Sequence, residues 1–256
     1  MRRRKIKIAL TVLLCVVMIV CGMYLLEFFV IQPSLSASDT EELRDLLSRA
    51  QPPASQSTSL ETAASSDPQP TFSEQLAALQ TVCPDIKGWL KIDGTLIDYP
   101  VLQSSASDPD YYLHRSYKGE YRDAGSLYLQ YDCTPNESMC SIIYGHHMRD
   151  DSMFGTLPGY DNLSYLKAHP SFTYGDETGW HTYDIFAVIE TTTAYKFNRT
   201  TFADTADFAA YLKDLQSRSL YETGVSVSAN DRIMLLATCS YERSNGRTIV
   251  CGVKKN

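Results

Sequence analysis

Beyond its first seven residues, the 256-residue sequence lacks any run of basic side chains. The opening MRRRKIK holds five of the 23 Lys and Arg residues, so the remainder carries 18 basic and 30 acidic residues, a balance of −12. Nucleic acid binding depends on clustered Lys and Arg, so we expect no nucleic acid partner. The same lack excludes attachment to a membrane through a polybasic surface outside that tail.

Acidic residues are absent from the first 26 positions, and residues 8–26 are apolar or small apart from Thr11. A membrane-spanning helix needs about 20 such residues, whereas the apolar part of a signal peptide has roughly 7–15. We therefore predict an uncleaved membrane anchor over residues 1–31. The basic tail would stay in the cytoplasm and the rest of the chain would lie outside the cell. The small residues at 34–38 resemble a cleavage site, which leaves a secreted form as the alternative.

The sequence also shows no evident pairing of its cysteines into disulfides. Five of the seven cysteines follow the apolar segment, and an odd number means that one thiol is free or pairs with another molecule. Cys133 and Cys140 flank the turn-rich TPNESM, so a disulfide across this hairpin and two unpaired core thiols both remain open.

Residues 32–71 are poor in large apolar side chains and rich in Ser, Thr, Ala, Pro and Gln. Such a composition buries too little apolar surface to offset the entropy of ordering, which predicts a flexible extracellular stalk. Within it, Leu43, Leu46 and Leu47 have helical spacing, so a short helix or a continuation of the stalk is expected there.

Residues 72–256 form the predicted folded domain. A helix capped by Ser73 and ended by Pro84 opens it. Short β-type runs between turn residues then dominate, which favours a mainly β fold, a closed barrel or a sandwich, over a parallel sheet with crossover helices. The runs are GWLKI, LIDYPVLQ, SLYLQYD, CSIIYGH, HTYDIFAVIETTT, RIMLLATCS and RTIVCGV.

Two helical insertions interrupt the strands. The pattern over residues 152–170 is weak and broken by Gly and Pro, whereas the one over residues 202–219 is strong. In the second, four apolar side chains share one helical face. They are Phe208, Tyr211, Leu212 and Leu215.

Cys239 ends one apolar run and Arg247 opens the next, so a short hairpin would bring both to one rim. A thiol becomes a nucleophile when it is ionised or has a base nearby, and a cation can stabilise the oxyanion that its attack creates. His146 and His147 end another apolar strand after Gly145, whose small size would let the backbone turn. A buried structural role for Cys239 is equally compatible with this pattern.

The other three histidines stand singly in polar segments, which is typical of surface or hydrogen-bonding residues. They are His114, His169 and His181.

Several of these stretches resemble class B sortases, the membrane-anchored cysteine transpeptidases of Gram-positive bacteria. LLATCSYE is similar to the T-L-x-T-C nucleophile motif, with Leu235 in the place of Thr. IIYGHHMRDDSMFG resembles the histidine segment of that class, in which the catalytic histidine directly follows the glycine. DIKGWLKIDGTLIDYPVLQ and DYYLHRSYKGEYRDAGSLYL resemble its early strands, and the resemblance covers about residues 72–253.

The resemblance implies a closed eight-stranded β-barrel with an N-terminal helix and an inserted helix before the nucleophile strand. It makes Cys239 the nucleophile, His146 the general acid/base and Arg247 the residue that stabilises the oxyanion or orients the substrate. His147 receives no catalytic role. Thr238 would shape the substrate site, and Tyr195 belongs to the segment 194–200 that would line the substrate groove.

A second position, besides Leu235, departs from the family pattern. Ala237 stands where class B enzymes often have Ser two residues before the cysteine. A hydroxyl contact to the substrate peptide from this position is therefore absent.

The implied reaction is a transpeptidation without metal or organic cofactor. Cys239 would cleave the C-terminal sorting signal of a surface protein after Thr, with an Asn-Pro-x-Thr-Asn-like signal expected. An amine of a peptidoglycan precursor or a pilin lysine would then resolve the thioacyl-enzyme.

Three other interpretations compete with the class B sortase. An L,D-transpeptidase would show Ser-His-Gly-Cys around the thiol and a papain-like protease Cys-Gly-Ser-Cys-Trp, and neither motif is present. A non-catalytic, membrane-anchored binding module on a sortase-like barrel is the non-enzymatic alternative.

Overall fold

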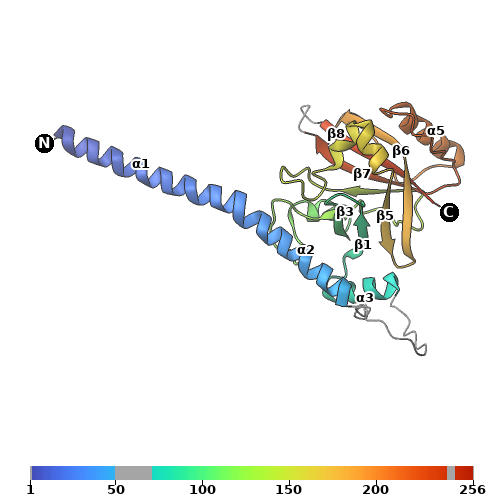
Figure 1. Ribbon diagram of the computed structural model, residues 1–256, viewed down its shortest axis with the longest axis horizontal. Helices are drawn as coiled ribbons and strands as arrows, with labels where there is room; N and C mark the ends of the chain where they lie inside the picture. The colour runs from blue at the N-terminus through green and yellow to red at the C-terminus, as the bar shows by residue number, and fades with distance from the viewer. Residues whose placement is uncertain (1, 50–70, 241–245, 256) are drawn as a thin grey trace, which may run out of the picture.

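The computed structural model describes residues 2–49, 71–240 and 246–255. Within these residues eight strands close into a barrel in the order β1-β2-β3-β4-β7-β8-β6-β5 (Figure 1). The closed barrel confirms the predicted fold class. The strands are β1 Ile86–Lys91, β2 Asp98–Gln103, β3 Leu127–Leu129, β4 Cys140–Tyr144, β5 Ser171–Asp176, β6 Gly179–Thr192, β7 Ile233–Ser240 and β8 Gly246–Lys254.

Two neighbouring pairs in the barrel are parallel, β2 with β3 and β4 with β7, and the remaining pairs are antiparallel. The parallel pairing of β4 and β7 brings the carboxyl ends of these two strands to the same rim. This pairing decides where the candidate site lies.

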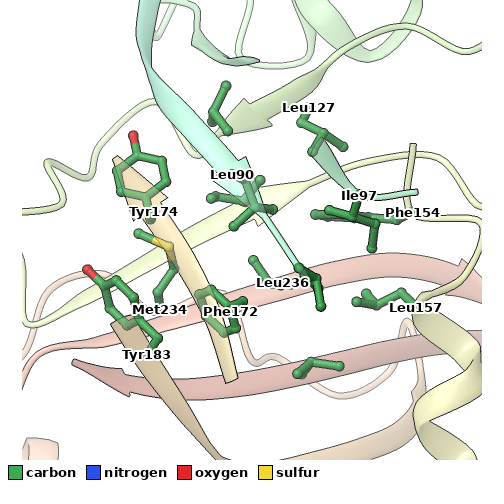
Figure 2. Packing of buried hydrophobic residues seen from close by; sticks show 14 of the residues in the cluster. Leu90, Ile97, Leu127, Phe154, Leu157, Phe172, Tyr174, Tyr183, Met234 and Leu236 are labelled. Atoms are coloured by element: carbon green, nitrogen blue, oxygen red, sulfur yellow. The ribbon is translucent and has the colours of Figure 1, made fainter. Parts of the chain in front are cut away.

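The barrel interior holds the main hydrophobic core, seen from close by in Figure 2. Residues of β7 alternate across the barrel wall, because Met234 and Leu236 join this core while Ile233 and Leu235 pack on the outside. Helix α5, Thr205–Ser217, contributes to the outer cluster. Both faces of β7 are therefore buried, which explains its continuous apolar run.

Helix α5 confirms the stronger predicted insertion. Asp204 caps it by accepting a hydrogen bond from the backbone N–H of Asp207. All four residues of the predicted face are buried: Phe208, Tyr211, Leu212 and Leu215. The weaker insertion forms only the 3-10 helix Leu157–Asp161 and the short helix α4, Leu163–Ala168.

Helix α3, Phe72–Val82, opens the domain as predicted, but its cap is Thr71 and not Ser73. The Thr71 hydroxyl accepts from the backbone N–H of Glu74, whose carboxylate accepts from the backbone N–H of Thr71. This reciprocal capping box satisfies two backbone N–H donors, whereas a single cap by the Ser73 hydroxyl would satisfy only one.

Strand β5 does not appear among the predicted runs. It has only Phe172 and Tyr174 as large apolar residues, and Gly175 and Asp176 close it. Its place in the barrel comes from pairing with β1 and β6.

A single continuous helix precedes the barrel and projects from it in Figure 1. It consists of α1 Arg2–Leu26, a π-helical turn Glu27–Ile31 and α2 Gln32–Arg49. Its N-terminal part is long and apolar enough to cross a membrane, and none of its most apolar window is buried against the protein.

The short helix expected around Leu43 is present and is longer than expected, because residues 32–49 of the predicted stalk are helical and pack on the barrel. Leu43 is fully buried, and Asp39 forms an ion pair with Arg122 (Nε–Oδ2 2.8 Å) and a second with Lys118 (3.1 Å). These contacts supply the stabilisation that the composition of the segment lacks. Residues 50–70 of the predicted stalk lie outside the described residues.

Cys133 and Cys140 do not form the hairpin disulfide, since both thiols are free and buried. The Cys133 thiol donates to the Gln130 carbonyl at 3.2 Å. Burial raises the pKa of this thiol to about 11, so it stays protonated and unreactive near neutral pH.

The docking of α2 can be tested with Leu43→Ala. Removing this fully buried side chain should weaken docking by about 2–5 kcal/mol, because it leaves a cavity. Hydrogen exchange of the amides in α2 should then rise by at least about 30-fold relative to wild type. Leu35→Ala, on the exposed side of the same helix, is the control; equal protection in both variants would contradict docking.

Candidate active site

The site lies at the rim where β4 and β7 end and β8 begins. Tyr144 of β4 is in register with Ala237 of β7, and the backbone N–H of Gly145 donates to the Ala237 carbonyl at 3.3 Å. Cys239 of β7 lies directly opposite Arg247 of β8 in the antiparallel ladder. The predicted hairpin that brings this thiol residue and this arginine to one rim is therefore confirmed.

A cleft of about 670 Å³ opens at this rim, which is within the usual size range of ligand sites. His146, Thr238 and Arg247 all line it, so three of the predicted site residues meet in one cavity. The other lining residues are Pro109, Asp110, Leu113, Tyr128, Gln130, Tyr131, Asp132, Tyr144, Gly145, Asn198 and Ala237.

Gly145 precedes His146 for a reason that differs from the expected one. Its φ angle is not among the positive values in the chain, so no left-handed turn requires glycine. Instead, a Cβ atom here would lie 2.3 Å from Cδ2 of Leu127 and 2.8 Å from Cδ2 of Phe154. Only glycine lets the backbone pass this close to the core on its way to His146.

The His146 imidazole is partly buried between two elements. The Leu113 backbone hydrogen-bonds to it, and the ring of His114 lies 4.9 Å from its own, centroid to centroid. Its Nε2 atom is buried and has no hydrogen-bond partner among the described residues. With one ring nitrogen held by a main-chain carbonyl, the other is the one available for proton transfer.

Burial lowers the pKa of His146 below its usual value, and the neighbouring His114 lowers it further. The Leu113 hydrogen bond and the charge of Asp123 oppose this shift without cancelling it. The imidazole is therefore mostly neutral near pH 7 and able to accept a proton.

His114 is exposed, as predicted for a surface residue, but its ring also contacts the rings of Tyr121 and His146. No local motif marks this position, because the contact joins segments that are distant in the sequence.

Thr238 links β7 to the histidine segment. Its side chain is buried, and its hydroxyl donates to the Gly145 carbonyl at 2.7 Å. Arg247 is partly buried, and its Nη1 donates to the Gly246 carbonyl at 2.9 Å. Thr238 thus fixes the backbone on which His146 stands, while Arg247 presents a positive charge at the cleft.

Tyr195 does not line the cleft. Its hydroxyl donates to Asp214 at 2.6 Å, and the guanidinium of Arg218 lies 4.3 Å from its ring centroid. From the segment 194–200, Asn198 reaches the cleft instead. A substrate contact by Tyr195 stays a prediction.

One wall of the cleft is polar and aromatic, and no sequence motif marks it. The Tyr144 hydroxyl donates to Gln130 at 2.8 Å, and the Gln130 amide donates to Asp132 at 2.7 Å. The Tyr128 hydroxyl donates to Asp110 at 3.2 Å. These bonds hold two carboxylates at the cleft.

A closed β-barrel that places a cysteine, a histidine and an arginine at one rim has the arrangement of a cysteine transpeptidase. The model of the Sortase domain family matches residues 90–255. The chain is 45% identical over 185 residues to sortase B of Listeria monocytogenes, covering 70% of this chain and 73% of that protein.

Two solved structures are also similar. A Staphylococcus aureus sortase B–substrate complex has a TM-score of 0.75 and 25% identity, covering 88% of this chain and 99% of the other. Sortase B of Bacillus anthracis in complex with AAEK2 has a TM-score of 0.72 and 31% identity, covering 87% and 98%. The chain belongs to the sortase family, and it is a cysteine transpeptidase of class B.

Gly145→Ala should damage the site through packing alone. The added methyl group collides with Leu127 and Phe154, and overpacking of this kind costs about 1–3 kcal/mol. We expect a lower thermal midpoint and a displaced His146, visible as changed imidazole NMR shifts. Gly224→Ala is the control for an added methyl group, because nothing lies within 4 Å of that position. Its own strain from a φ of 77° should lower the midpoint without moving the His146 signals.

The environment of His146 predicts its titration. Its NMR pKa should lie below about 6.5, and His114→Gln should raise it because a like charge is removed. Since the unfolded chain binds this proton first, His146 should lower folding stability as the pH falls through about 6.5. His181→Gln, which removes a histidine bonded to Thr178 and Asp176, is the control. An unchanged His146 titration in His114→Gln would contradict the assigned contact.

Proposed function

We propose that this class B sortase acts on the outer side of the membrane and cleaves the C-terminal sorting signal of a surface protein after Thr. The proposal is supported above all by the cleft that His146, Thr238 and Arg247 share at the end of the strand that carries Cys239. The apolar helix before the barrel supports membrane attachment, with the basic tail in the cytoplasm.

In the first half-reaction, the thiol of Cys239 gives its proton to His146, and the sulfur attacks the Thr carbonyl. Arg247 stabilises the resulting oxyanion or aligns the carbonyl, which is typically worth about 10²–10³ in rate. The tetrahedral intermediate collapses as His146 protonates the leaving amine, and a thioacyl-enzyme remains. The buried, unpaired Nε2 of His146 suits it to carry this proton both ways.

In the second half-reaction, an amine attacks the thioester and gives its proton to His146. The acceptor is an amine of a peptidoglycan precursor or of a pilin lysine. Asp110 and Asp132 line the cleft and favour a positively charged approaching group over an anionic one. The expected signal resembles Asn-Pro-x-Thr-Asn.

The docked helix α2 changes how the barrel reaches its substrates. Because Asp39 and Leu43 join the helix to the barrel, the catalytic domain stands close to the end of the membrane segment. Substrate and acceptor are both held at the membrane in this proposal. A short and stiff connection therefore keeps the cleft at the distance from the membrane at which both are found.

The proposal is tested with the full chain in detergent and fluorogenic peptides that carry Asn-Pro-x-Thr-Asn or Leu-Pro-x-Thr-Gly. Wild type should cleave the first after Thr and join the fragment to an added amine. Cys239→Ala should abolish cleavage, and Arg247→Met should lower kcat by about 10²–10³. Arg247→Lys keeps the charge but not the fork of donors, so it should fall between wild type and Arg247→Met.

The outcome separates the transpeptidase from the binding module. Cleavage that survives in Cys239→Ala would overturn the assigned nucleophile. Binding of a peptide by folded wild type without cleavage, together with a Cys239 inert to alkylation, would favour the non-catalytic module.

A further inference from the structure

A second cavity, which shares no lining residue with the cleft, lies at the junction of the N-terminal helix and the barrel. We call it the junction pocket. It has a volume of about 480 Å³ and lies between Phe29, Gln32 and Ser36 of the helix and Tyr99, Ala124 and Met153 of the barrel domain. Its size falls within the range of small-molecule sites, and its lining is mainly apolar.

The pocket contains two polar atoms that lack partners among the described residues. Ser36 is only 9% exposed, and its hydroxyl has no hydrogen-bond partner. The Oε1 atom of Gln32 is likewise buried and unpaired, although its amide group donates to Glu27. Buried polar atoms without partners are destabilising, so their presence in an apolar pocket indicates a ligand with an apolar body and a polar end.

The helix is locally widened where it lines the pocket. The π-helical turn Glu27–Ile31 ends at Gln32, whose backbone N–H donates to the Glu27 carbonyl five residues back. Pro33 follows and has no N–H to continue the normal pattern. Single π-helical turns occur frequently at functional sites.

The facing wall is also unusual. Asp151 and Met153 both have positive φ angles, 63° and 52°, which non-glycine residues rarely adopt. The segment is nevertheless fixed, because the Phe154 N–H donates to the carbonyl of His146 at 2.9 Å and Met153 forms a bridge with His147. Strained backbone that its surroundings hold in place is typical of ligand sites.

The position of the pocket identifies the ligand. Residues 6–31 have exposed apolar side chains and span about 39 Å at 1.5 Å per residue. The hydrocarbon core is only about 30 Å thick. Phe28 and Phe29, which line the pocket, therefore reach the outer lipid–water interface.

We infer that the junction pocket binds a membrane lipid, with one acyl chain between the helix and the barrel and an ester or hydroxyl group bonded to Ser36 and Gln32. The rim carries Asp123, Arg149 and Asp150, a mixture that does not select an anionic headgroup. The inference rests on the membrane attachment in the proposed function, but not on the chemistry of Cys239.

The experiment uses the full chain in nanodiscs of phosphatidylcholine that include a phosphatidylcholine with a diazirine near the end of one acyl chain. After irradiation, labelled peptides are identified by mass spectrometry. We expect labels in residues 6–31, which report insertion, and also in residues 148–153 of the barrel domain. Peptide cleavage is measured on the same samples, so loss of activity is scored separately from loss of lipid binding.

Ala37→Trp is the decisive variant, because Ala37 lines the pocket but is itself exposed and can accept a larger side chain. An indole here should lower labelling of residues 148–153 by about tenfold or more by filling the space, with labelling of residues 6–31 unchanged. Leu35→Trp, exposed and outside the pocket, should keep both labels.

Three results would overturn the inference. In the first, the membrane segment of wild type is labelled but residues 148–153 are not. In the second, Ala37→Trp leaves the labelling of residues 148–153 unchanged. In the third, residues 6–31 carry no label. The second would indicate contact with the bilayer surface, and the third would also refute membrane attachment while leaving cleavage of peptides by the barrel untouched.

Discussion

The site depends on the backbone ladder that holds β7 between β4 and β8. Parallel pairing with β4 brings Ala237 beside Tyr144, and antiparallel pairing with β8 brings Cys239 opposite Arg247. A shift of one residue in either register would turn every side chain of β7 to the other face. Burial of both faces of β7 opposes such a shift, so the hydrophobic core fixes the positions of Cys239 and Arg247.

A small set of contacts then orients the His146 side chain. Gly145 lets the chain pass between Leu127 and Phe154, and Thr238 holds the Gly145 carbonyl from the neighbouring strand. The Leu113 backbone fixes one side of the His146 ring. The imidazole is thus oriented by a main-chain group and packing, while burial keeps its pKa low and its second nitrogen has no partner among the described residues.

Local patterns predicted the parts of this arrangement that are close in the sequence. The helical face of α5 could be read from its spacing, and the hairpin of Cys239 and Arg247 spans a short connection. The family motifs also pointed to His146. The roles of these three residues remain proposals, although their backbone positions are now explained.

Contacts between distant segments could not be predicted in this way. Asp39 and Arg122 are 83 positions apart, and no sequence pattern near either residue predicts the ion pair that docks this Ser-rich helix. His114 reaches His146 only because the 3-10 helix Tyr111–His114 packs against β3. Strand β5 has too little apolar sequence of its own, and its partners define it.

The central claim is that Cys239 forms the covalent intermediate in a cleft shared with His146 and Arg247. Intact-protein mass spectrometry tests it most directly, on wild type mixed with a sorting-signal peptide in the absence of an amine acceptor. The account predicts a mass gain equal to the peptide fragment that ends in Thr, located on Cys239 and released by hydroxylamine. Peptide cleavage without any adduct, or an adduct on another residue, would contradict it.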